Sequence, residues 1–150
     1  MLEFQSVRDV IQFAISLERV SQQFYYELAE KVTDPGVCGF LLEIAGEEAL
    51  HEAQLRSLLE DGGQAVAGQV DTREIQAYVQ AMQIPDELDY KKAVKVACDK
   101  EKASQMLYLI LSNSVTAEHI KQLLLALSKQ EQKHKEFFAK EYNRICLSEN

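Results

Sequence analysis

The chain has little of what most small domains use for cross-links and sharp turns. Its 150 residues include two prolines, six glycines, no tryptophan, and three widely spaced cysteines, Cys38, Cys98 and Cys146. No Cys-x-x-Cys pair occurs, so we expect neither a disulfide scaffold nor a metal site built on paired cysteines. Unpaired cysteines are typical of a reducing compartment, which predicts a cytoplasmic protein. Scarce glycine and proline favour helices over sheets.

An excess of basic residues and a long apolar run are also missing. Lysine and arginine number 16 against 24 acidic residues, and the net charge is −8. A nucleic-acid-binding surface needs the opposite balance, so we expect no nucleic-acid partner. No run of about 18 apolar residues occurs, which argues against a membrane span. Glu3, Arg8 and Asp9 interrupt the first apolar stretch, which therefore does not resemble a signal peptide.

What the chain does have is helical periodicity. Apolar residues recur at steps of three and four residues in four long segments, over about 7–31, 37–60, 86–112 and 116–145. The first two segments are joined by the short breaker Thr33-Asp34-Pro35-Gly36, and the last two by residues 113–116, where Thr116 is a candidate N-cap. Short joints of this kind predict two antiparallel helical hairpins.

The connection between the two hairpins is longer. Asp61-Gly62-Gly63 predicts the end of the second helix, and a short helix is expected over about 73–83, before Pro85. A connection over 61–85 can return along a helix of about 20 residues, which is ~30 Å long. We therefore predict an all-α fold, an antiparallel four-helix bundle with one long crossover, and a single domain over residues 1–150.

The two predicted hairpins are related by an internal duplication. Residues 14–51 align without a gap on residues 97–134, an offset of 83 residues, with twelve identical pairs. The pairs are Ala14/Ala97, Glu18/Glu101, Ser21/Ser104, Gln22/Gln105, Tyr25/Tyr108, Leu28/Leu111, Val32/Val115, Thr33/Thr116, Leu41/Leu124, Leu42/Leu125, Glu48/Glu131 and His51/His134. The duplicated units span about 7–60 and 86–145.

Six of the duplicated residues are acidic or imidazole side chains at core positions of the helical stripes. They are Glu18, Glu48, His51, Glu101, Glu131 and His134. Because steps of three, four and seven residues stay on one helix face, these side chains are predicted to point into the bundle. Burying four carboxylates together costs several kcal/mol per ion and adds mutual repulsion. Two divalent cations would neutralise that charge, with the imidazoles as neutral ligands, so the sequence predicts a site for two metal ions.

The ligand types narrow the choice of metal. Carboxylate and imidazole ligands without sulfur suit iron or manganese, and we expect iron first. Tyr25 and Tyr108 lie seven residues after Glu18 and Glu101. They are either plain core aromatics or donors whose hydroxyl groups hold the ligand carboxylates.

With these motifs the chain resembles the rubrerythrin-type branch of the ferritin-like superfamily. The resemblance rests on Glu18-x6-Tyr25, Glu48-x-x-His51 and their duplicates, and it covers nearly the whole chain. It implies a ferritin-like bundle in which Glu48 and Glu131 bridge two ions. Glu18 with His51, and Glu101 with His134, would then be terminal ligands.

Two features depart from rubrerythrins proper. The 150 residues contain none of the paired Cys-x-x-Cys motifs of the C-terminal rubredoxin domain that those proteins carry, so we expect a domain-only form. Ser104 stands where rubrerythrins proper have an additional ligand glutamate, three residues after the glutamate of the third helix. The near-symmetric set of six ligands is more similar to the shorter, domain-only relatives.

The resemblance and the ligand set together imply a non-haem di-iron oxidoreductase that acts on H2O2 or O2 and is re-reduced by an external electron donor. Two alternatives remain at this point: a ferroxidase or iron-handling protein, and a non-enzymatic metal-binding module. Apolar residues on the predicted outer faces, among them Tyr26, Leu42 and Leu125, favour a homodimer.

Overall fold

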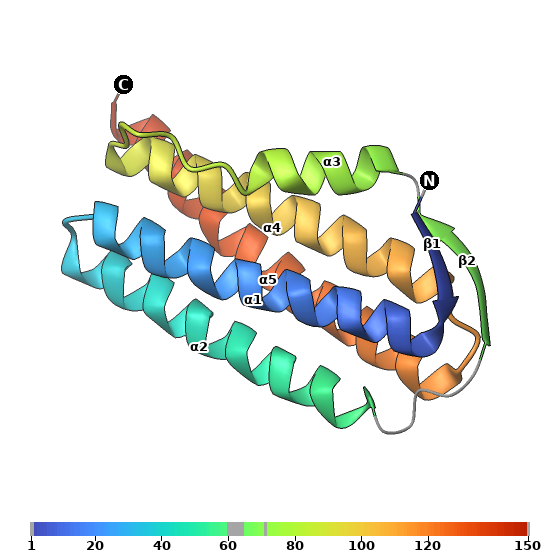
Figure 1. The fold of residues 1–150 in the computed structure, drawn as a ribbon. Coiled ribbons are helices and arrows are strands. Elements are labelled where there is room, and N and C mark those ends of the chain that lie inside the picture. The colour runs from blue at the N-terminus through green and yellow to red at the C-terminus, as the bar shows by residue number, and fades with distance from the viewer. Residues whose placement is uncertain (1, 60–64, 71, 150) are drawn as a thin grey trace.

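Four long helices dominate the structure. The computed structural model describes residues 2–59, 65–70 and 72–149, and only the backbone of residues 2–7, 65–70, 72, 74, 75 and 79. The helices are α1 (Val7–Lys31), α2 (Pro35–Ser57), α4 (Tyr90–Asn113) and α5 (Glu118–Ser148), and a shorter α3 (Thr72–Ala81) lies along α4 (Figure 1). The predicted all-α four-helix bundle is confirmed.

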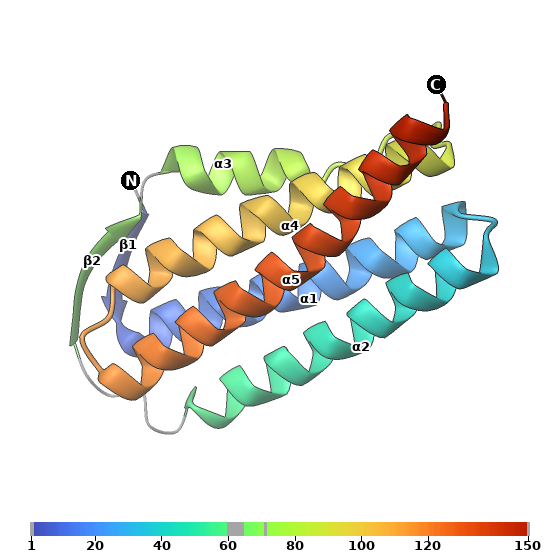
Figure 2. The ribbon, with the colours of Figure 1, turned by 180° about the vertical axis from the view of Figure 1, so that it is seen from behind.

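The bundle consists of two antiparallel hairpins, α1 with α2 and α4 with α5, each packed along most of its length. Asp34 ends the first joint as the N-cap of α2, where its Oδ1 accepts a hydrogen bond of 2.9 Å from the backbone N–H of Val37. Pro35 follows in the first helical turn, where its missing N–H costs nothing. Seen from behind, α5 passes in front of α1 and α4 (Figure 2). Hydrogen bonds between α1 and α4 and a ring contact between α2 and α5 join the two hairpins around a common interior.

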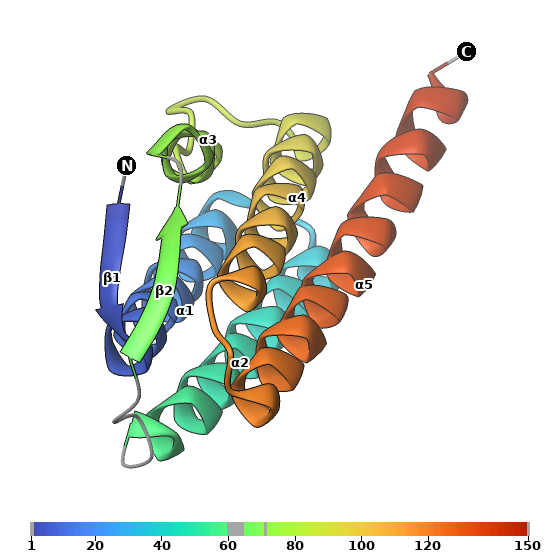
Figure 3. The same ribbon diagram turned by 90° about the vertical axis from the view of Figure 1, so that its right-hand side faces the viewer.

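The crossover between the hairpins contains a strand that the sequence analysis did not predict. Strand β2 (Ala65–Val70) pairs antiparallel with β1 (Leu2–Ser6), with an irregular register between Phe4 and Ser6. The pair stands across one end of the bundle (Figure 3). Each strand is short, and the paired residues lie 59 to 68 positions apart in the sequence, from Ser6 with Ala65 to Leu2 with Val70, so neither strand has a local pattern that identifies it. The predicted short helix is present as α3.

Some helix boundaries also differ from the prediction. Helix α4 begins at Tyr90 rather than near Asp86, because Asp89 is the N-cap and accepts a hydrogen bond of 2.8 Å from the backbone N–H of Lys92. The predicted Thr116 cap is wrong: Ala117 occupies the N-cap of α5, without a side-chain hydrogen bond. The predicted stop at residues 61–63 lies outside the described residues.

The interior has three layers along the bundle axis. One apolar cluster lies toward the β1–β2 end and the other toward the α1–α2 joint, and the acidic and imidazole side chains lie between them. The first includes Ile11, Leu55, Leu107, Leu111 and Leu124, and the second includes Leu28, Leu41, Ile44, Val94 and Phe138. None of the helices among the described residues combines the length and apolar character needed to span a membrane.

Candidate metal centre

Each long helix contributes to the polar layer. Glu18 comes from α1, Glu48 and His51 from α2, Glu101 from α4, and Glu131 and His134 from α5. All six are buried; the histidines, at 7% exposure, are the most accessible. Within each Glu-x-x-His pair, the three-residue step places both side chains on the same inward face. The structure therefore brings together all six residues singled out in the sequence.

The six side chains form two overlapping groups. Glu18, Glu48, His51 and Glu131 offer ligand atoms that all lie within 4.8 Å of one another, and so do Glu48, Glu101, Glu131 and His134. We call these groups the Glu18 position and the Glu101 position. Glu48 and Glu131 belong to both positions. The geometry thus allows two adjacent cations that share two carboxylates.

Distances within the groups are too long for direct hydrogen bonds. The Nδ1 atom of His51 lies 3.6 Å from Oε1 of Glu18 and 3.8 Å from Oε1 of Glu131. The Nδ1 atom of His134 lies 3.6 Å from the nearest oxygens of Glu48 and of Glu101. Good N–H···O bonds span 2.7–3.2 Å as a rule, so these atoms surround common points instead of bonding to each other.

Buried polar atoms without hydrogen-bond partners indicate that the cluster is suited to cations. Seven buried side-chain nitrogen and oxygen atoms of the described residues have no hydrogen-bond partner, and every one belongs to these six residues. They include Nδ1 of both histidines and at least one oxygen of each glutamate. Native proteins rarely leave such atoms unpaired, because each costs ~1–3 kcal/mol. Metal coordination would satisfy them, so the side chains present fit a bound metal ion.

Two tyrosines hold the carboxylates of Glu101 and Glu18, each of which belongs to a single position. The hydroxyl of Tyr25 on α1 donates a hydrogen bond to Oε1 of Glu101 on α4, and the hydroxyl of Tyr108 on α4 donates one to Oε1 of Glu18 on α1. Both rings are buried. Each bond crosses from one hairpin to the other, so the duplicated tyrosines connect the halves and orient these carboxylates.

The histidines differ in their outer contacts. Nε2 of His134 lies 2.5 Å from Oε2 of Glu47, whose side chain is 43% exposed. The equivalent neighbour of His51 in the duplication would be Gln130, and no contact of this kind joins these two. A hydrogen bond on one ring nitrogen fixes the tautomer that leaves the other nitrogen free for a metal. Glu47 therefore orients the His134 imidazole so that its Nδ1 faces the cluster and is free to bind a metal ion.

An unexpected cation borders the cluster. Lys100 on α4 is fully buried, and its Nζ donates a hydrogen bond to the Ser21 hydroxyl. The same atom lies 3.4 Å from Oε1 of Glu101 and 3.6 Å from Oε2 of Glu131. A buried lysine is tolerated only beside compensating negative charge, and this one contacts two carboxylates.

The four carboxyl groups of the cluster differ in pKa. Burial and the charge of Glu48 raise the pKa of Glu18, and burial with the charges of Glu101 and Glu48 raises the pKa of Glu131. Burial opposes ionisation of Glu48 as well, but Lys100 and the neighbouring carboxyl groups lower its pKa to about 2. Lys100 also lowers the pKa of Glu101 against its burial. Such divergent pKa values are typical of functional sites.

The imidazoles also diverge. Burial lowers the pKa of His51. Burial has the same effect on His134, but the nearby charges of Glu101 and Glu48 and the hydrogen bond with Glu47 outweigh it and raise the pKa to about 8. The two halves of the duplication therefore share ligand types but differ in electrostatic environment.

A surface opening reaches the cluster from the side of α2 and α5. It has a volume of about 380 Å³ and is lined by His51, Glu47, Leu50, Leu123 and Gln130, among others. His51, a member of the cluster, lines this opening and is slightly exposed. A small molecule could reach the imidazole side of the cluster by this route.

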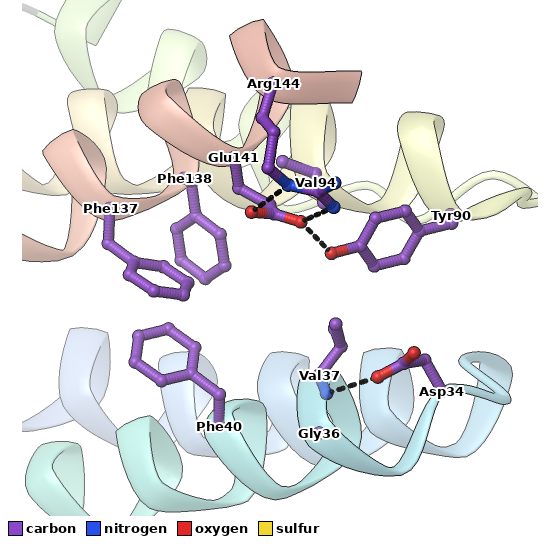
Figure 4. Close-up of a pocket in the computed structure, with 10 residues that line it drawn as sticks. All are labelled: Asp34, Gly36, Val37, Phe40, Tyr90, Val94, Phe137, Phe138, Glu141 and Arg144. Carbon is purple, nitrogen blue, oxygen red and sulfur yellow. Dashed lines mark hydrogen bonds and ion pairs between the residues drawn. The ribbon is translucent and has the colours of Figure 1, made fainter. Parts of the chain in front are cut away.

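A second pocket, of about 280 Å³, lies nearer the α1–α2 joint (Figure 4). Phe40 on α2 faces Phe137 and Phe138 on α5, and Glu141 joins Arg144 and Tyr90 on the polar side. The pocket lacks the convergent carboxylates and imidazoles of the cluster. Phe138 lines this pocket, and its ring also stacks on that of Tyr25, with 6.3 Å between the ring centres.

Sequence reasoning missed Lys100, Glu47 and Tyr78. The duplication could have revealed Lys100 and Glu47, because each differs from its counterpart in the other half. Lys100 stands where the first half has Leu17, a member of an apolar stripe, and Glu47 stands where the second half has Gln130. Tyr78 had no such signal: it comes from α3, and its hydroxyl donates a hydrogen bond of 3.2 Å to the backbone carbonyl of Leu17.

Known proteins share this architecture. Residues 9–142 match the family model described as Rubrerythrin. A hypothetical protein from Pyrococcus furiosus has a similar solved structure, with a TM-score of 0.66 and 22% identity over 92% of this chain and 89% of that chain, which shows a shared fold. None of the curated proteins searched matches the chain. Since the family match spans most of the chain and all six residues of the cluster, the protein belongs to the rubrerythrin family.

Proposed function

We propose that the cluster binds two metal ions, iron in the first place, and that the protein is an oxidoreductase acting on H2O2 or O2. One observation carries the proposal: the unpartnered buried polar atoms of the described residues all belong to the six side chains of the cluster. A structural polar network would have paired these atoms with one another. Instead, the unpartnered nitrogen and oxygen atoms point toward common centres, as the ligands of a bound cation do.

The ligand chemistry supports iron. Each position offers three carboxylates and one imidazole and no sulfur, a set that suits iron or manganese. When bound, two ferrous ions would supply the two electrons that, with two protons, convert one H2O2 to two water molecules. Family membership agrees with this choice of metal.

The chain's own residues would prepare that chemistry. Tyr25 and Tyr108 hold the terminal carboxylates, and Glu47 orients His134. The apolar clusters on both sides keep water from the carboxylates, which strengthens every electrostatic interaction there. The opening beside His51 provides a route for a small oxidant.

Electrons would come from outside the described part of the chain. Beyond the two positions, the described residues contain no further group of metal-binding side chains that could serve as a second redox centre. We therefore propose that an external donor re-reduces the site after each turnover.

An assay of catalytic turnover distinguishes the proposed oxidoreductase from a ferroxidase and from a non-enzymatic metal-binding module. The protein is loaded anaerobically with Fe(II), then given H2O2 or O2 and a reductant, alongside Glu48→Gln and a control, Glu43→Gln, on the exposed face of α2. Repeated oxidant consumption that Glu48→Gln abolishes and Glu43→Gln retains supports the proposal. Oxidation of Fe(II) far beyond the bound ions, without reductant-driven turnover, would instead identify a ferroxidase. Bound metal without either reaction would identify a metal-binding module.

A further inference from the structure

Lys100 breaks the two-fold symmetry of the cluster. The duplication pairs it with Leu17, which is buried in the apolar core. The ligands themselves are repeated without change, and so are the tyrosines that hold the terminal carboxylates. Lys100 thus places a buried positive charge beside one half of an otherwise repeated site.

The contacts of Lys100 favour one of the two positions. Its Nζ lies 3.4 Å from Glu101, which belongs to the Glu101 position alone, and 3.6 Å from Glu131, which both positions share. Toward the Glu18 position its hydrogen bond ends on the Ser21 hydroxyl and not on Glu18. Nζ also lies 4.7 Å from the centre of the Tyr25 ring, whose hydroxyl bonds Glu101. Among the carboxylates that the two positions do not share, Lys100 therefore contacts Glu101 and not Glu18.

We infer that Lys100 is a permanent third cation of the cluster and makes the two metal positions unequal, the Glu101 position being the weaker. The inference rests on the proposed binding of two ions. A cation entering the Glu101 position must share Glu101 with the ammonium and is repelled by it at close range. In a buried, weakly screened site this repulsion is far larger than in water.

Glu47 acts in the opposite direction, but more weakly. Its carboxylate contacts His134 and should favour a cation at the Glu101 position. The Glu47 side chain is 43% exposed, so water screens its charge, whereas Lys100 has no exposed surface. Glu47 also acts through the imidazole, while Lys100 contacts two carboxylates directly. The effect of the lysine should prevail.

Lys100 has a second consequence for the protein without metal. Two of the four carboxylates have a positive partner in contact even when no ion is bound. This lowers the repulsion that would otherwise open the polar layer. The same contact that weakens metal binding therefore stabilises the metal-free bundle.

Single-position variants measure the inequality directly. His134→Ala leaves the ligands of the Glu18 position intact, and His51→Ala leaves those of the Glu101 position. Each variant is titrated with Mn²⁺, which is redox-inactive here, and free Mn²⁺ is followed by its electron paramagnetic resonance signal. We expect His134→Ala to bind Mn²⁺ on the order of tenfold to a hundredfold more tightly than His51→Ala.

Lys100→Leu, which copies the residue of the first half, is then added to each variant. We expect the difference in Mn²⁺ affinity to shrink, mainly because the Glu101 position binds Mn²⁺ more tightly. The melting temperature of the protein freed of metal by a chelator should fall. Ser21→Ala is the matched control: it removes the hydrogen bond to Lys100 but keeps the charge, so the difference should persist. Moving the lysine, as Leu17→Lys with Lys100→Leu, should reverse the order of the two positions.

Failure of this inference can be told apart from failure of the proposed function. If the unmodified protein binds no Mn²⁺, the proposed function fails. If it binds two ions and the two positions are equal, or Lys100→Leu leaves their difference unchanged, only the role of Lys100 is wrong. Should Lys100→Leu not fold without metal, Leu17→Lys alone, which keeps Lys100, must weaken the Glu18 position; an unchanged affinity there would overturn the inference.

Discussion

The hydroxyl of Tyr25 on α1 donates a hydrogen bond to Glu101 on α4, in the opposite hairpin. The duplicated pair, Tyr108 and Glu18, makes the reciprocal bond. Each tyrosine is thus anchored in one half of the protein and orients a carboxylate of the other. These two hydrogen bonds, together with apolar packing, connect the two sides of the cluster. Loss of either bond should therefore reduce both the metal affinity of the cluster and the stability of the bundle.

Replacing either tyrosine by phenylalanine should reduce both stability and metal affinity. Tyr25→Phe removes only the hydroxyl and leaves a buried carboxylate oxygen of Glu101 without that donor. We expect a loss of ~1–3 kcal/mol in the free energy of unfolding and about 10–100-fold in metal affinity. Chemical denaturation and metal titration measure both. Tyr26→Phe, at a neighbouring ring that is 45% exposed, is the control and should change neither.

Glu47 should matter for metal binding although it is not a ligand in our proposal. Glu47→Gln removes the charge that holds Nε2 of His134 while keeping the side-chain shape. We expect up to about tenfold weaker binding at the Glu101 position, the low end of the effect of such hydrogen-bond partners, and little change at the Glu18 position. Titration of the His51→Ala and His134→Ala backgrounds distinguishes the two. Equal weakening in both backgrounds would show that Glu47 acts through overall charge and not through His134.

Shared and terminal carboxylates should differ in their effect on stoichiometry. Glu101 belongs to one position, so Glu101→Gln should leave one ion bound per chain. Glu48 belongs to both positions, so Glu48→Gln should weaken both ions together. Metal content after desalting measures the difference. Loss of a single ion from Glu48→Gln would contradict the shared position of this carboxylate.

Stability of the metal-free protein should fall as the pH rises from 6.5 to about 8. The pKa of His134 rises from 6.5 to about 8 on folding, so its charged form stabilises the bundle below pH 6.5, and this contribution is lost as the pH passes about 8. It amounts to at most roughly 2 kcal/mol. The raised pKa values of Glu18 and Glu131 act in the same direction, because their ionisation opposes folding.

Metal affinity should change in the opposite sense across the same range. A cation binds the neutral imidazole and ionised carboxylates, so binding releases protons and strengthens with rising pH. Thermal melts with and without chelator, between pH 6.5 and about 8, should therefore diverge. Parallel curves would show that these groups do not bind the metal. His134→Ala should flatten the pH dependence of the chelated protein.

The sequence was sufficient to predict the bundle and to single out the residues that meet at its centre. Helical periodicity, two short joints and a duplicated ligand pattern are local or repeated signals, and they located Glu48 and His51 as readily as Glu131 and His134. The tyrosine hydroxyls could have bonded elsewhere, and only the packing of α1 against α4 determines their acceptors.

What the sequence did not reveal depends on contacts between distant segments. The β1–β2 pair joins strands on opposite sides of α1 and α2 in the sequence, and Tyr78 reaches α1 from the crossover. Lys100 is a polar residue beside Glu101 on a helix, a position that is usually solvated. Only the comparison with Leu17 in the duplicated half indicated that the position is internal.

Metal content tests the central claim most directly. Protein reconstituted with Fe(II) under anaerobic conditions is desalted without chelator and analysed for iron, beside a Glu48→Gln/Glu131→Gln double variant whose fold is checked by circular dichroism. Our account predicts two irons per chain in the unmodified protein and none in the folded double variant. An unmodified protein that retains no iron, or a double variant that retains as much, would contradict it.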